Sequence, residues 1–148
     1  LVIILTLLGF QSVAQTSYTK LPKTWEKDFT ITLSFSGSMD GSNTDLRYTY
    51  DSCIYLRNTG MKPAKKDVYL LTEADRIEIL KRLRDMKVDK INSEISISAV
   101  HDGWSTSICF GSHCVQGGTS AKISEHDKEV FSTAYGYLEE FAMIKTSR

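Results

Sequence analysis

Cysteine carries the clearest chemical prediction in this 148-residue chain, which has three of them. Cys109 and Cys114 flank Gly111-Ser112, a pair typical of a type II′ hairpin turn, so they face each other on neighbouring strands. At such a position two Cα atoms lie about 4.5 Å apart, which a disulfide accepts. We therefore predict a Cys109–Cys114 bond; a bond from Cys53 to either cysteine, or three free thiols, are the alternatives.

The remaining cysteine and the histidines could in principle form a nucleophile or a metal site. A cysteine nucleophile needs an imidazole beside it. Strand parity, however, puts Cys53 on the outward side of the expected sheet, and His101 and His113 on the inner side. The three histidines, His101, His113 and His126, do not have a spacing typical of metal ligands, such as H-x-x-x-H. We expect a packed or idle thiol at Cys53, no catalytic residue and no metal.

Three loops resemble ligand loops in composition only. Asp40, Asn43 and Asp45 form a loose version of a calcium loop, without its terminal Glu. Residues 36–38 (Ser-Gly-Ser) and 117–119 (Gly-Gly-Thr) have the glycines of a phosphate loop, but neither lies between a strand and a helix. Paired carboxylates, a serine elbow and a nucleotide fingerprint are missing from the sequence. We expect no cofactor, and a binding domain rather than an enzyme.

The start of the chain resembles an export signal. Leu1 to Phe10 is an apolar run, and the small residues Ser12 and Ala14 suit a cut before Gln15. A membrane span needs roughly 20 apolar residues, more than this run supplies. We predict that residues 1–14 are a signal peptide and that the protein is exported, periplasmic or secreted, with no membrane insertion after removal; an uncleaved anchor is the alternative. N-terminal mass analysis should find Gln15 first, and retention of Leu1 to Phe10 in membranes would contradict this.

Composition and charge suit one compact domain. The chain is 41% hydrophobic, and 18 basic residues balance 18 acidic ones, so no long-range field favours nucleic acid or anionic lipid. Residues 15–28 form a lead-in segment in which Trp25 packs as a plug, and residues 29–148 form a single α+β domain. The oligomeric state is not predicted.

The spacing of apolar residues predicts two strands and two helices. Phe29 to Ser36 alternates strictly, with Phe29, Ile31, Leu33 and Phe35 on one face. Leu46 to Arg57 forms a second strand after a turn-rich loop. Two helices start with capping patterns, at Thr72 with Asp75 and at Ser124 with Asp127. Their expected buried stripes are Ile77, Ile79, Leu80, Leu83 and Met86 in the first, and Val130, Phe131, Ala134, Leu138 and Phe141 in the second.

Two turn signals between the helices predict a three-stranded meander. Asp102-Gly103 suits a type I′ turn that pairs Ile97 with Ile108, and Gly111-Ser112 pairs Ile108 with Val115. Serines fall on the opposite face. The predicted fold is α+β: a single antiparallel sheet of about five strands in the order β-β-α-β-β-β-α, with two amphipathic helices packed on one face and a hydroxyl-rich face opposite.

This layout resembles emfourin, a small proteinaceous inhibitor of metallopeptidases. The residues that carry the likeness are Ser36-Gly37-Ser38 in the first loop, the helix start Leu71-Thr72 with Asp75, and the turn Asp102-Gly103. The family tends to have Ser-Gly-Gly in that loop, and the strands here are longer and contain cysteines. The resemblance covers element order over about residues 29–141, and it implies peptidase inhibition.

The functional prediction is an exported non-enzymatic domain that binds a protein or peptide in the envelope or outside the cell. A small secreted hydrolase or other enzyme, and a structural component of an envelope assembly, are the alternatives. A concave pocket that gathers Cys53, a histidine and a carboxylate would favour catalysis. Loops supply most binding contacts, so the candidate binding residues are Ser36, Ser38, Met39, Asp40, Asp102 and Trp104.

Overall fold

The computed structural model describes residues 18–37, 41–60, 62–95, 104–119 and 121–146, so the predicted signal peptide lies outside the described residues. The strands are β1 (Ile31–Ser36), β2 (Asn43–Tyr48), β3 (Ser52–Asn58), β4 (Lys65–Leu70), β5 (Ser93–Ile95), β6 (Ser105–Phe110), β7 (His113–Gly118) and β8 (Ala121–Ile123). The helices are α1 (Glu73–Asp85) and α2 (Glu125–Thr146), with a short 3₁₀ turn at Val88–Lys90.

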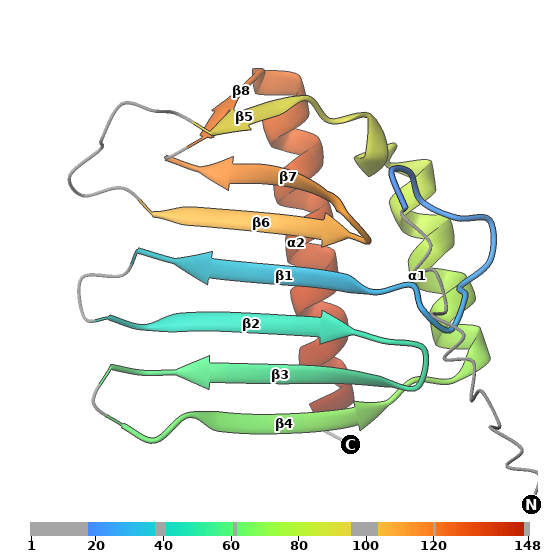
Figure 1. The fold of residues 1–148 in the computed structure, drawn as a ribbon, viewed down its shortest axis with the longest axis vertical. Helices are drawn as coiled ribbons and strands as arrows, with labels where there is room; N and C mark the ends of the chain where they lie inside the picture. Colours follow the sequence, from blue (N-terminus) through green and yellow to red (C-terminus); the bar gives the residue numbers. More distant parts are fainter. Residues whose placement is uncertain (1–17, 38–40, 61, 96–103, 120, 147–148) are drawn as a thin grey trace, which may run out of the picture.

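In the described part of the chain, six strands form one antiparallel sheet in the order β4-β3-β2-β1-β6-β7 (Figure 1). β5 and β8 form a separate pair beside β7, where the Gln116 N–H donates to Ser93 Oγ at 2.7 Å. The α+β class and the antiparallel sheet are confirmed. The expected count of about five strands is wrong, because one expected strand is two, β2 and β3, because β4 was not recognised, and because β5 pairs with β8 outside this sheet.

The expected strand Leu46–Arg57 is two strands, β2 and β3. A tight turn separates them, with the Thr49 N–H bonded to the Ser52 carbonyl at 2.8 Å. Tyr48 lies opposite Cys53, and residues directly opposite in an antiparallel pair share a face. Cys53 therefore faces the core and is 1% exposed. The prediction that it faces outward is wrong, because the turn changes the strand parity.

β4 is an edge strand that periodicity did not indicate. Its Lys-Lys-Asp start lacks the residues typical of strands, yet it pairs with β3 from Ser52 to Arg57. Val68 and Leu70 on β4 are 54% and 79% exposed, and Leu56 on β3 is 40% exposed. This part of the outer sheet face is apolar rather than hydroxyl-rich.

Half of the predicted meander is confirmed. Around Gly111-Ser112, Phe110 pairs with His113 and Ile108 with Val115, as expected. The other half is wrong, because β1 occupies the second edge of β6 and places Leu33 beside Ile108. β5 pairs with β8 instead, so Ile95 lies opposite Ala121. Residues 96–103, including the Asp102-Gly103 turn, lie outside the described residues.

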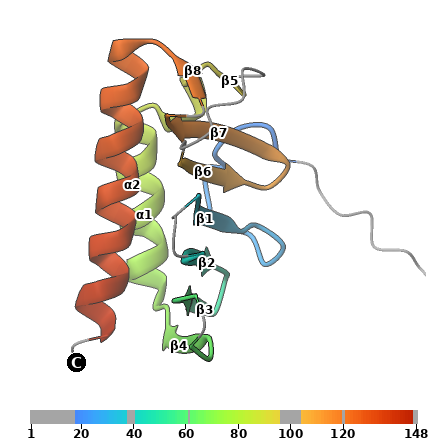
Figure 2. The same ribbon diagram turned by 90° about the vertical axis from the view of Figure 1, so that its left-hand side faces the viewer.

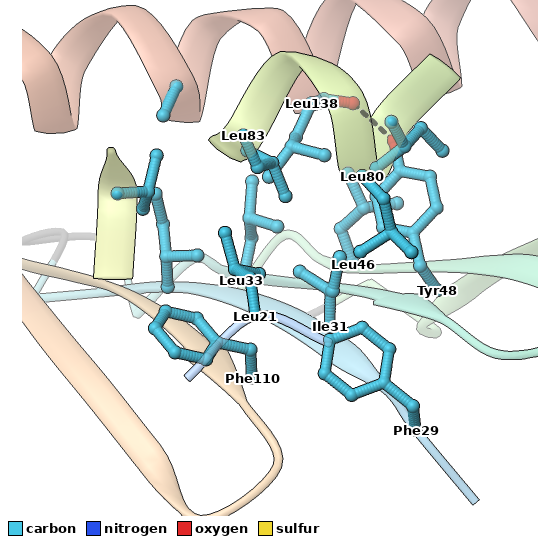
Figure 3. Close-up of a cluster of buried hydrophobic side chains, with 14 of the residues drawn as sticks. Leu21, Phe29, Ile31, Leu33, Leu46, Tyr48, Leu80, Leu83, Phe110 and Leu138 are labelled. Carbon is cyan, nitrogen blue, oxygen red and sulfur yellow. Dashed lines mark hydrogen bonds between the residues drawn. The ribbon is translucent and has the colours of Figure 1, made fainter. Parts of the chain in front are cut away.

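The core joins the inner sheet face to both helices, which Figure 2 shows on the same side of the strands. Side chains from β1, β2, β6, α1 and α2 meet in one cluster (Figure 3). The Tyr48 hydroxyl donates to the Leu138 carbonyl of α2 within it. The predicted stripe of α1 is narrower than expected, since Ile79, Leu80 and Leu83 are buried whereas Ile77 is 61% exposed at the stripe's edge.

The lead-in segment closes one end of this core. Trp25 is buried, as predicted, and its indole N–H donates to the Phe29 carbonyl at 3.0 Å. Tyr18 accepts the Ser112 N–H through its carbonyl at 3.3 Å. Gly111 is required here twice over, because its φ is +59° and an added Cβ would lie 2.5 Å from that of Tyr18.

Candidate functional site

A cleft of about 680 Å³ opens between α2 and the inner face of the sheet. This volume lies within the range typical of sites for small ligands. Its lining residues are contributed by β1, β2, β6, β7, β8 and α2 and by the segments next to β6 and β7: Phe35, Thr44, Trp104, Thr106, Gly117, Gly118, Thr119, Ile123, Lys128, Phe131, Ser132, Tyr135, Gly136 and Glu139.

Two glycines let aromatic rings close onto the floor of the cleft. A Cβ on Gly117 would lie 2.2 Å from Phe131 Cε1, so this ring packs directly against the Gly117 backbone. Gly118 has φ +80°, and a Cβ there would lie 2.6 Å from the Trp104 carbonyl oxygen. These glycines serve close packing within and after β7, and the phosphate-loop likeness of residues 117–119 is compositional only.

Trp104 is the predicted binding residue that the structure places in the cleft. The backbone N–H of Trp104 donates to Thr119 Oγ1 at 2.9 Å, and the centroid of its ring lies 6.3 Å from that of Phe35. The residue remains 43% exposed, so part of its large apolar surface is accessible. Ser36 is exposed at the end of β1 and does not line the cleft. Ser38, Met39, Asp40 and Asp102 lie outside the described residues.

Thr106 lies on the floor of the cleft, opposite Phe35 of β1. It is 6% exposed, and its Oγ1 has no hydrogen-bond partner within the part of the chain that the structure describes. A buried hydroxyl without a partner costs about 1–3 kcal/mol. Such an orphaned group is unusual in a folded protein, and this one is covered by the surrounding atoms.

Two charged side chains mark the ends of the cleft along α2. Lys128 and Glu139 are eleven residues apart, which corresponds to about 16 Å along a helix. Burial raises the pKa of the half-buried Glu139 carboxyl. Burial first, and then the charge of Glu139, raise the pKa of the Tyr135 hydroxyl, which bonds to the Thr44 side chain. The cleft is therefore aromatic and hydroxyl-lined between a basic end and an acidic end.

The cysteines lie away from this cleft. Cys109 and Cys114 are bonded as predicted, with an S–S distance of 2.09 Å and a Cα separation of 4.0 Å. Burial raises the pKa of the Cys53 thiol to about 12, although a hydrogen bond with Tyr48 acts in the opposite direction. A thiol so protonated at neutral pH is a poor nucleophile, so Cys53 is a packing residue.

The described histidines do not gather either. The His113 ring packs against Phe110 with centroids 4.9 Å apart, and His126 is exposed in the first turn of α2. Across the described ranges, no three His, Cys, Asp or Glu side chains come together as a metal site requires. Among those same residues, no helix is long and apolar enough to cross a membrane.

The comparisons with known proteins add no relative. No protein-family model matches the chain, and no curated protein matches it.

Sequence reasoning missed most of the cleft. Phe131 of the predicted buried stripe, Tyr135 and Glu139 follow one another at intervals of four residues along α2. Together with Gly136 in a helix interior, this spacing was the available signal. The partners Phe35 and Thr44 come from distant strands, whose place beside α2 depends on long-range pairing.

Proposed function

We propose that this protein is a binding domain whose cleft between α2 and the sheet holds an extended peptide. The observation that carries the proposal is the cleft itself, about 680 Å³ in volume, with aromatic rings and hydroxyl groups along its length. Phe35, Trp104 and Tyr135 offer apolar contact area to peptide side chains, and hydroxyls such as that of Ser132 can hydrogen-bond to peptide amides. The predicted protein or peptide partner is thereby narrowed to a peptide segment.

Binding suits this lining better than catalysis. None of the described residues that line the cleft is a histidine or a cysteine, and Cys53 lies in the core. The charged groups Lys128 and Glu139 stand about 16 Å apart along α2, too far to act on the same reacting atom. The pocket of cysteine, histidine and carboxylate that would favour an enzyme is not formed by these residues.

Export is part of the same proposal. The Cys109–Cys114 bond supports it, because disulfides persist in oxidising compartments such as the periplasm. An exported domain of this kind would meet peptides outside the cytoplasm. Inhibition of a peptidase remains a prediction that rests on element order alone.

The cleft can be blocked at Gly136 without disturbing the core. A Cβ added there meets no atom within 4 Å, and the residue lines the cleft on an exposed part of α2. Gly136→Ala should raise the free energy of unfolding by about 0.5–1 kcal/mol and leave peptide retention unchanged. Gly136→Trp should fold equally well and lower the retention of a randomised pentapeptide mixture about tenfold.

Retention is measured by incubating the mixture with immobilised protein and quantifying the recovered peptides by mass spectrometry. Unchanged retention by Gly136→Trp would place the peptide elsewhere, with the first loop, residues 36–45, as the next candidate. Failure of the wild-type protein to retain any peptide would overturn the proposed function.

A further inference from the structure

Lys128 at one end of the cleft and Glu139 at the other carry opposite charges, and these charges restrict which peptides can bind. We propose that the ligand is a free peptide of about five residues, bound with its amino terminus at Glu139 and its carboxyl terminus at Lys128. This inference rests on the proposed function, since it names the class of peptide that the same cleft takes.

Glu139 provides the site for an ammonium group. The side chain is half-buried on the flank of α2 that borders the cleft, and no described lysine, arginine or histidine forms an ion pair with it. A half-buried carboxylate without a cation is less favourable than one fully in water. A ligand ammonium would supply the missing cation, and the neighbouring Tyr135 ring adds a favourable surface for it.

Lys128 provides the site for a carboxylate. Its ammonium lies 3.9 Å from Glu125 Oε1, with the lysine side chain 61% exposed and the glutamate side chain 91% exposed. Such a pair is weak, so Nζ can turn to a ligand. Lys128 is also near the start of α2, where the helix dipole favours negative charge. The helix dipole therefore favours a carboxylate at the Lys128 end of the cleft.

The separation of the two groups sets the ligand length. Eleven residues of helix rise about 16 Å, and an extended chain advances about 3.3 Å per residue. Five residues span that distance. A longer peptide, or an internal segment of a protein, has no terminal charges at these positions.

The test compares three pentapeptide mixtures on the full-length protein: one with both ends free, one acetylated at the amino terminus and one amidated at the carboxyl terminus. Each modification should lower retention by the wild-type protein about tenfold. In Glu139→Gln, acetylation should make no further difference, and in Lys128→Gln, amidation should make none. Octapeptides with free ends should be retained less than pentapeptides.

Matched controls separate these effects from changes in net charge. Glu140→Gln and Lys122→Gln alter exposed residues that do not line the cleft, and both should behave as wild type. Retention that depends on Gly136 but not on the peptide ends would overturn this inference and leave the proposed function standing. An acetylation effect that survives in Glu139→Gln would place the ammonium elsewhere and also overturn it. Failure to retain any mixture would overturn the proposed function itself.

Discussion

Replacing Ile108 with alanine is expected to lower the free energy of unfolding by about 2 to 4 kcal/mol. Ile108 is fully buried at the centre of β6. Leu33 lies beside it on β1 and Val115 on β7. Removing the side chain leaves a cavity, and the hydrogen-bonded strands on both sides of β6 prevent the backbone from moving in to fill it. Urea denaturation of the purified variant, compared with wild type, measures the difference.

Ser107→Ala is the matched control on the opposite face of the same strand. Ser107 lies beside Ser34 on β1, away from the helices and the core cluster. We expect a change within about 0.5 kcal/mol in either direction. If both variants lost the same free energy of unfolding, both faces of the sheet would have to be covered, whereas the structure buries only the face that carries Ile108.

Local patterns predicted the parts of the fold that local interactions decide. The alternation of β1 leaves Phe29, Ile31 and Leu33 buried, because a period of two can satisfy only one face. The capping box at Thr72 and Asp75 forms with both of its hydrogen bonds. The turn at Gly111-Ser112 sets the register of the β6–β7 hairpin, because it involves only residues that are neighbours in the sequence.

Pairing across distant segments could not be predicted in the same way. The turn after Tyr48 contains neither glycine nor proline, and Asp51-Ser52, which favour turns, are a weaker signal for separating β2 from β3. The neighbour of β6 was expected to be the adjacent segment, yet β1 takes that edge. The two alternatives bury similar apolar side chains, and only the competition within the whole sheet distinguishes them.

The same limit explains how the cleft was missed. Trp104 was predicted from its type and its position beside a turn signal, and it lines the cleft. Glu139 and Phe131 are separated from it by more than twenty residues, and they meet it only once α2 lies across the inner face of the sheet. Their spacing on the helix is visible in the sequence, but their partners are not.

Replacing Asp75 with alanine is expected to lower the free energy of unfolding by about 2 to 3 kcal/mol. The carboxylate accepts the Thr72 N–H at 2.8 Å in the capping box of α1, and it lies 2.8 Å from Lys145 Nζ near the end of α2. Loss of the cap contributes about 1 kcal/mol. The rest comes from Lys145, whose side chain is 25% exposed and would keep a charge without its partner.

The loss should depend on pH. Burial opposes ionisation of Asp75, but hydrogen bonds from Lys145 and Thr72 outweigh it, so the pKa of the carboxyl lies below its ordinary value of 3.8. A lowered pKa in the folded state stabilises the protein above the unfolded-state value, and this contribution disappears as the pH falls through the folded-state value. Urea denaturation at pH 7 should show the full difference between wild type and Asp75→Ala, and at about pH 2.5 a smaller one.

Lys81 and Asp85 provide a matched control on the same helix. Their ion pair has a similar distance, 2.9 Å, but the side chains are 70% and 61% exposed. Exposed pairs at this spacing contribute little to stability. Asp85→Ala should therefore cost far less than Asp75→Ala, because solvent screens the first pair while the second joins the start of α1 to the end of α2 out of water. Equal losses would mean that the Asp75–Lys145 pair adds nothing beyond an ordinary surface contact, and that the helices are held together by their apolar faces alone.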